Sequence, residues 1–309
     1  MSNYITEIKI NKVRHLENLS INLGDEKKHL ILTGKNGSGK TSVLEELDNL
    51  LLVEPLQLIS FGEPTYTDIP NVSINHEYDN QEYFYAYFSA KRTSNTMQKP
   101  NGIEKIELSK IKDKKLNTYF LKYIVALKAE RSFAKDDNDE EIVKKIDSWF
   151  NTFEEMLRQI FNDDSLQLQF DRRNIMSYNF LIKRSNREPF DFTTLSDGYS
   201  AIIDIVTEIL LKIETTESKS FDVEGIVLID EVEAHLHVEM QKHIMRLLTE
   251  FFPKIQFIIT THSPFVLQSI ENSVVYDLER KEQLSSDALH DASYTQIVKN
   301  YFKVDSEYS

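Results

Sequence analysis

The sequence has 309 residues, a formal net charge of −14 and no cysteine, so disulfides and thiolate chemistry are excluded. Its length suits one large or two modest domains, and 40% hydrophobic residues are enough to form a buried core. The polar start MSNYITEIKI lacks the apolar core of a signal peptide, and no apolar run reaches membrane-spanning length, so we expect a cytoplasmic protein with no membrane partner. The acidic balance argues against indiscriminate binding to nucleic acid, although it does not exclude a local basic strip.

The first elements predict a nucleotide-binding loop that follows a small edge sheet. ITEIKI and NLSINL alternate in polarity and predict two short antiparallel strands. HLILT, residues 29–33, predicts a buried strand, and apolar residues at helical spacing predict a helix over residues 43–51. Between them lies GKNGSGKTS, which fits the pattern GxxxxGK[ST]. Its backbone N–H groups are expected to close around phosphate oxygens at a helix start.

We expect Lys40 to meet the β- and γ-phosphates of ATP and Thr41 to ligate Mg²⁺ through its hydroxyl. The nucleotide-binding residues predicted from this loop are Gly34, Asn36, Gly37, Ser38, Gly39, Lys40, Thr41 and Ser42.

The middle of the chain, residues 56–189, has a different pattern and predicts an inserted lobe of strands and helices. Strands are expected in EYFYAYFSA, IEKIEL, LQLQF and YNFLIKR, and helices over residues 118–130 and 140–161. The acidic run DDNDEE is typical of a solvated loop that opens a helix. The nucleotide core, residues 1–55 and 190–309, is therefore expected to be split in the sequence.

Beyond Asp197, predicted helices over residues 200–213 and 238–252 alternate with strands GIVLID and IQFIITT, the rhythm of a parallel α/β sheet. Asp230 and Glu231 emerge at the carboxyl edge, where such sheets bind ligands. Asp230 is placed to hold Mg²⁺, and Glu231 to polarise an attacking water as general base. The next strand delivers His262 to the same edge, where it is suited to contact a γ-phosphate or the water.

The segment TTLSDGYSA offers a further anion site at a helix start. Ser196 supplies a hydroxyl and Gly198 an unhindered backbone N–H. Taken alone, this segment is typical of an ordinary helix cap.

In this order the motifs resemble the ABC-type ATPase head, in particular the SMC/RecF-like and OLD-like branch. The match is carried by DEVEAHLH, the downstream FIITTHSPFVL and LSDGYSA, and it covers residues 1–55 and 190–275. The resemblance implies that Ser196–Tyr199 is the ABC signature, Glu231 the catalytic glutamate, residues 234–237 the D-loop and His262 the switch histidine. The sequence departs from the usual LSGGQ signature, since Asp197 and Tyr199 replace a glycine and a glutamine.

The resemblance also implies a fold and a function. We expect an α/β core of mainly parallel sheet with an antiparallel edge sheet, an ATPase that uses ATP and Mg²⁺, and a head-to-tail homodimer, or a higher homo-oligomer, assembled through ATP. Its output would be control of a separate effector, a nuclease or toxin, in bacterial anti-phage defence. The alternative is a RecF-like or SMC-like repair or chromosome-maintenance ATPase that clamps DNA directly.

Two further features stay open at this point. The Q-loop glutamine expected in such a head is either Gln81 or Gln98, and neither has a defining neighbourhood. His235 and His237 suggest metal ligands, but no third ligand is evident nearby, and zinc usually needs three or four.

Overall fold

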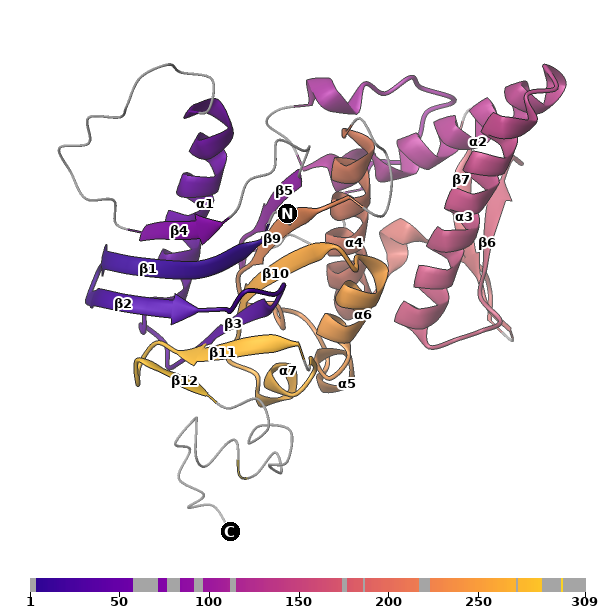
Figure 1. The fold of residues 1–309 in the computed structure, drawn as a ribbon. Coiled ribbons are helices and arrows are strands. Elements are labelled where there is room, and N and C mark those ends of the chain that lie inside the picture. Colours follow the sequence, from indigo (N-terminus) through magenta and orange to yellow (C-terminus); the bar gives the residue numbers. More distant parts are fainter. Residues whose placement is uncertain are drawn as a thin grey trace, which may run out of the picture. The chain divides into compact units, whose positions relative to one another are not determined.

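The computed structural model describes residues 4–57, 72–76, 84–91, 97–111, 115–173, 177–185, 187–216, 223–270, 272–284 and 296. The chain forms two compact units, one made of Met1–Arg92 and Asp222–Ser309 and the other of Thr93–Phe221. The first unit is thus discontinuous in the sequence (Figure 1). Its borders differ from the expected ones, since residues 56–92 fall in the first unit and residues 190–221 in the second.

A six-stranded sheet forms the centre of the first unit, in the order β12-β11-β3-β10-β9-β5 (Figure 1). Its strands are β3 (His29–Thr33), β5 (Phe84–Phe88), β9 (Gly225–Ile229), β10 (Ile255–Thr260), β11 (Ser273–Asp277) and β12 (Glu282–Leu284). All neighbours run parallel except β11 and β12. Strands β3, β9 and β10 are buried at every residue, which explains their continuous apolar sequences.

A second, antiparallel sheet lies in the same unit and consists of β1 (Ile5–Val13), β2 (Leu16–Asn22) and β4 (Val72–His76). The two predicted strands of the edge sheet are confirmed, and β4 adds a third that the sequence did not indicate. Helix α1 (Lys40–Gln57) shares one apolar core with both sheets: Val43, Leu44 and Leu47 cluster with residues of β1, β2, β3, β9 and β10. This core fixes the start of α1, and with it the phosphate loop, relative to the central strands.

Three short helices complete the described part of the first unit: α5 (Val238–Gln241), α6 (Ile244–Phe251) and α7 (Pro264–Leu267). The single helix predicted over residues 238–252 is wrong, because it is broken at Lys242 and His243. Just before the break, Gln241 is held by side-chain bonds, donating to the Leu236 carbonyl (2.8 Å) and accepting from Ser263 Oγ (2.7 Å).

The second unit contains α2 (Phe120–Asp136), α3 (Glu140–Phe161), α4 (Asp197–Glu214) and a three-stranded antiparallel sheet, β6 (Gln167–Asp171), β7 (Asn179–Lys183) and β8 (Phe190–Asp191). Short 3₁₀ turns cover Leu108–Lys110, Leu116–Tyr119 and Phe192–Thr194. The predicted helix over residues 140–161 matches α3, and the acidic run before it is exposed, with Asp139 capping the helix by accepting from Ile142 N–H.

The strand predicted from IEKIEL is wrong. Residues 103–107 form neither helix nor strand, and the following backbone bonds are local: Lys110 N–H donates to Glu107 O and Ile111 N–H to Leu108 O. Ile103 is 51% exposed, so the alternating apolar pattern does not correspond to one buried face. Among the described residues, no helix has the length and apolar character needed to cross a lipid bilayer.

Candidate functional site: a phosphate loop at the carboxyl edge of the sheet

The phosphate loop connects β3 to α1, as the sequence predicts. Gly34 and Gly39 have φ angles of +133° and +97°, which side-chain-bearing residues rarely adopt. A Cβ at Gly34 would lie 2.8 Å from Ser38 Oγ, and one at Gly39 would lie 2.9 Å from Leu16 Cδ1, so both positions require glycine. The loop is therefore built to keep its backbone close and unobstructed, the geometry that phosphate binding needs.

Inside this loop the Ser38 hydroxyl is buried and, in the part of the chain that the structure describes, has no hydrogen-bond partner. A buried unsatisfied hydroxyl is costly in a folded protein unless a ligand or ion completes it. Ser42 is buried as well, whereas Asn36 and Gly37 are exposed at the loop tip. These features fit a phosphate group.

Lys40 is only 5% exposed and lies folded over the loop. Its Nζ donates to the Gly34 carbonyl (2.9 Å) and the Lys35 carbonyl (3.1 Å). Burial lowers the pKa of Lys40, and the nearby carboxylates, first Glu231 and then Asp230, oppose that shift. The ammonium group thus sits among the acidic residues of the same edge, as expected for the phosphate-binding lysine.

Thr41 and Asp230, the two predicted Mg²⁺ ligands, are brought together. Thr41 Oγ1 donates to Asp230 Oδ1 at 3.2 Å, although 189 positions separate them in the sequence. Asp230 is 1% exposed and also accepts from Thr260 Oγ1 at 2.6 Å. Mg²⁺ is usually held by one or two carboxylates, a hydroxyl and substrate phosphates, so this pair fits that ion. No cluster of three or more His, Cys, Asp or Glu side chains suited to a metal occurs within the described ranges.

Glu231 lies in the turn after β9 and has a φ of +47°, an uncommon conformation for a non-glycine residue. Its backbone N–H donates to Thr260 Oγ1 at 2.7 Å, so this hydroxyl links both acidic residues to the end of β10. Such local strain is often found where a functional side chain must be aimed.

His262 follows β10 at the same edge and is half-buried. Burial lowers its pKa, the positive charge of Lys40 lowers it further, and Asp230 opposes the shift. The ring is therefore neutral near pH 7, able both to donate and to accept a hydrogen bond.

Glu233, to which the sequence analysis gave no role, accepts two hydrogen bonds from the residues around His262. They come from His262 N–H (2.5 Å) and Thr261 Oγ1 (2.8 Å). Thr260, which bonds Asp230 and Glu231, was missed too. The hydroxyls of Thr260 and Thr261 could have been found from the sequence, because a strand that ends in two consecutive threonines before a histidine is a visible pattern.

The segment interpreted as the ABC signature lies in the second unit, at the start of α4, so the predicted helix start is confirmed. Ser196 is the exposed N-cap residue and its side chain makes no cap bond, while Gly198 is buried in the first turn. Tyr199, one of the departures from LSGGQ, stacks on Phe161 of α3 with ring centroids 4.3 Å apart. The tyrosine therefore has a packing role within its own unit.

The remaining sequence candidates do not join the site. Gln81 lies outside the described residues, and Gln98 is an exposed residue of the second unit whose N–H donates to the Thr118 carbonyl. His235 and His237 are both exposed.

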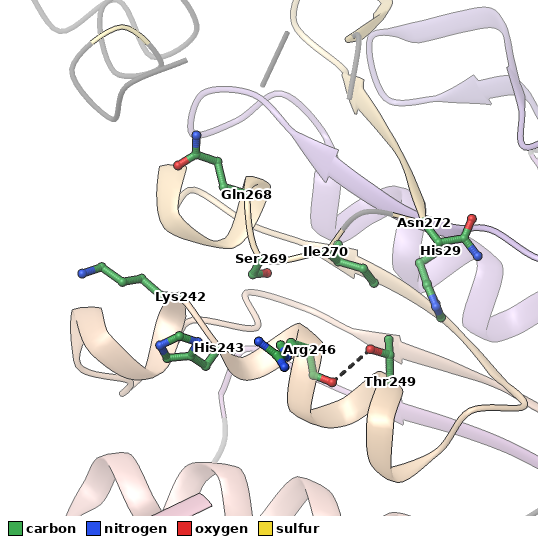
Figure 2. A pocket seen from close by; sticks show the side chains of 9 residues that line it. All are labelled: His29, Lys242, His243, Arg246, Thr249, Gln268, Ser269, Ile270 and Asn272. Atoms are coloured by element: carbon green, nitrogen blue, oxygen red, sulfur yellow. Dashed lines mark hydrogen bonds between the residues drawn. The ribbon is translucent and has the colours of Figure 1, made fainter. Parts of the chain in front are cut away.

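A separate hollow of about 700 Å³ lies between the α5–α6 segment and the chain after α7 (Figure 2). Its cations already have partners, since Lys242 pairs with Glu239 and Arg246 with Glu250, both at 2.7 Å. Of its two histidines, His29 and His243, the first is structural: burial, followed by the charge of Lys27, lowers the pKa of His29 to about 3, and its Nδ1 accepts from Phe257 N–H. We assign no ligand to this hollow.

A family model described as "AAA domain, putative AbiEii toxin, Type IV TA system" matches residues 78–268, more than half of the chain. The chain belongs to this AAA-domain family. The match includes Asp230, Glu231 and His262, and the predicted membership of an ATPase family is confirmed.

Curated relatives of this AAA-domain protein include the Septu protein PtuA of Bacillus mycoides (strain KBAB4), 27% identical over 91% of this chain and 41% of that protein. The Retron Ec83 probable ATPase of Escherichia coli is 31% identical over 40% of this chain and 24% of that protein. The AAA-domain chain thus spans about two fifths of the PtuA length. These relatives confirm the predicted resemblance to bacterial ATPases.

Among solved structures, the AAA-domain chain is similar to an Smc head bound to the C-terminal winged-helix domain of ScpA, with a TM-score of 0.49, 14% identity and coverage of 91% of this chain and 98% of that one. It is also similar to an SMC head domain from Thermotoga maritima, with a TM-score of 0.46, 14% identity and coverage of 89% of this chain and 94% of that one.

Proposed function

We propose that this chain binds and hydrolyses ATP and uses the cycle as a switch that controls a partner protein in bacterial anti-phage defence. One observation carries the catalytic part. The first unit gathers a buried lysine, a hydroxyl–carboxylate pair, a strained glutamate and a neutral histidine at one sheet edge. The test is ATP turnover by the purified chain and by its Lys40→Ala and Glu231→Gln variants.

In this mechanism Thr41 and Asp230 would hold Mg²⁺, which supplies positive charge to the phosphate oxygens when bound. Lys40 places its ammonium group beside the β- and γ-phosphates. Glu231 orients the attacking water and accepts its proton. His262, held neutral by burial and by Lys40, hydrogen-bonds the γ-phosphate or the water.

The second part of the proposal is dimerisation, with the signature of one copy completing the ATP site of the other. This part is supported by the resemblance of the segment around Ser196 and Gly198 to the ABC signature. It is also supported by the exposed position of Ser196 at the start of an 18-residue helix. Helix starts favour anions through free N–H groups and the helix dipole.

We expect Ser196→Arg to abolish ATP-dependent dimerisation, because the larger cationic side chain would fill the space proposed for the γ-phosphate. Light scattering at micromolar concentration, in a Glu231→Gln background, measures the effect. Ser132→Arg, an exposed change in α2 of the same unit, is the control and should dimerise normally. A Ser196→Arg chain that dimerises as fully as the control would contradict the assignment of the signature.

The third part concerns the output. The PtuA and retron relatives come from anti-phage defence systems, which supports a switch that acts in such a system. We expect the purified chain to hydrolyse ATP slowly and to cut neither DNA nor RNA. Metal-dependent nuclease activity that survives Lys40→Ala and stringent purification would overturn this. ATP-dependent and salt-sensitive retention on DNA would favour the DNA-clamp alternative.

A further inference from the structure

Glu233 lies two residues after the proposed general base, in the turn that joins β9 to α5. Both of its carboxylate oxygens are engaged by the end of β10: Oε1 accepts from His262 N–H at 2.5 Å, and Oε2 accepts from Thr261 Oγ1 at 2.8 Å. The chain separations are 29 and 28 positions, so these are tertiary contacts. One side chain thus joins the segment of Glu231 to the segment of His262.

The same two segments are joined once more, by the preceding threonine. Thr260 Oγ1 donates to Asp230 Oδ1 and accepts from Glu231 N–H. The backbone adds a third link, since Val232 N–H donates to the Thr260 carbonyl at 3.1 Å. The Thr260 contacts hold the start of the turn, and the Glu233 contacts hold its middle.

The turn needs such support. Glu231 and His235 both have positive φ angles, +47° and +69°. Such angles are uncommon for non-glycine residues and persist where the surrounding structure holds them in place. A half-buried carboxylate that accepts two bonds in fixed directions is a strong restraint, because charge-assisted hydrogen bonds are short and directional.

Burial raises the pKa of Glu233, and the charge of Glu231 raises it further, whereas the bonds from His262 N–H and Thr261 lower it. Both oxygens of Glu233 already accept bonds from the end of β10, which favours a role through its neighbours over contact with the reacting atoms. It differs in this respect from Glu231, which we place at the attacking water.

We propose that Glu233 is a positioning residue that holds the general base Glu231 and the phosphate-facing His262 at a fixed separation. The proposal rests on the proposed ATPase mechanism. It predicts that loss of the Glu233 contacts slows the chemical step and leaves ATP binding intact, because Lys40, Thr41 and the glycine loop are not touched. Misplacing a catalytic group by about 1 Å can cost on the order of a hundredfold in rate.

The experiment compares Glu233→Ala, Glu233→Gln and the control Glu239→Ala, whose carboxylate in α5 is exposed and pairs only with Lys242 among the contacts described. Single-turnover hydrolysis should fall about ten- to a hundredfold in Glu233→Ala, with the ATP Kd unchanged within about twofold. Glu233→Gln, which keeps one oxygen acceptor, should fall between wild type and alanine. A normal single-turnover rate in Glu233→Ala, or an equal loss in Glu239→Ala, would overturn the proposal.

Thr261→Val provides a second test, because valine keeps the shape of the threonine side chain and removes only the hydroxyl that bonds Glu233. If Glu233 acts partly through this hydroxyl, the Glu233→Gln and Thr261→Val losses should be non-additive in a double-mutant cycle, and fully additive losses would count against it. The NMR signal of the His262 ring in the nucleotide-free chain separates this inference from the ATPase proposal, because it needs no turnover. The signal should shift in Glu233→Ala and stay in place in Glu239→Ala; an unmoved signal in both would refute the positioning role even if hydrolysis failed altogether.

Discussion

Glu231→Gln is expected to bind ATP as tightly as the unchanged chain and to hydrolyse it on the order of a hundred- to ten-thousandfold more slowly, because a general base contributes about that much to the rate. The amide keeps the size of the side chain and cannot accept the proton of the attacking water. The bond from residue 231 N–H to Thr260 Oγ1 is a backbone contact and survives the change. The fold of the turn should therefore persist.

The measurements are ATP affinity by fluorescence titration and single-turnover hydrolysis. Glu239→Gln is the matched control, since it makes the same chemical change at an exposed residue of α5 that pairs with Lys242. Tight binding with undiminished turnover in Glu231→Gln would remove Glu231 from the role of base. Equal losses in both variants would point to an effect of charge on the whole protein.

Lys40→Ala is expected to weaken ATP binding by roughly a hundredfold, in line with the loss of one strong electrostatic contact to phosphate. The site makes the effect large, because the carboxylates nearest in effect to Lys40, those of Glu231 and Asp230, remain after the change. Without the ammonium group they repel the phosphates. Burial lowers the pKa of Lys40, yet these same carboxylates favour its charged form.

The titration should be repeated with Lys144→Ala, a solvent-exposed lysine of α3 that pairs with Glu140 on the helix surface. This control is expected to keep the affinity of the unchanged chain. Thermal unfolding of both variants without nucleotide shows whether the loop still folds, since Lys40 also satisfies the Gly34 and Lys35 carbonyls. Affinity within about twofold of wild type in a folded Lys40→Ala chain would contradict the phosphate role.

Much of the core could be predicted from the sequence because its elements carry strong local signals. Strands β3, β9 and β10 are continuous apolar runs, and a strand buried on both faces needs that composition. The phosphate loop is equally local, since the positive φ angles at Gly34 and Gly39 require glycine at those positions. The polar residues that end these strands could be placed at one sheet edge because parallel strands share a direction.

Other elements have weaker signals. The strand β11 is buried at all five residues, yet the sequence analysis did not identify it, and β12 pairs with it over only three residues. IEKIEL alternates like a strand but has no partner in the described structure, and strand formation depends on pairing with a neighbour.

The sequence by itself determined where the nucleotide loop, the pair Asp230 and Glu231, and the histidine after β10 lie along the strands. Each of these features is a short motif of consecutive residues at the end of a strand. Only the tertiary structure decided which side chains connect them. Glu233 reaches Thr261 and His262 across 28 and 29 positions, and Thr41 reaches Asp230 across 189. A glutamate two residues from another glutamate has no pattern that reveals its partner, because that partner is set by strand register and burial, which arise only when distant segments pack together.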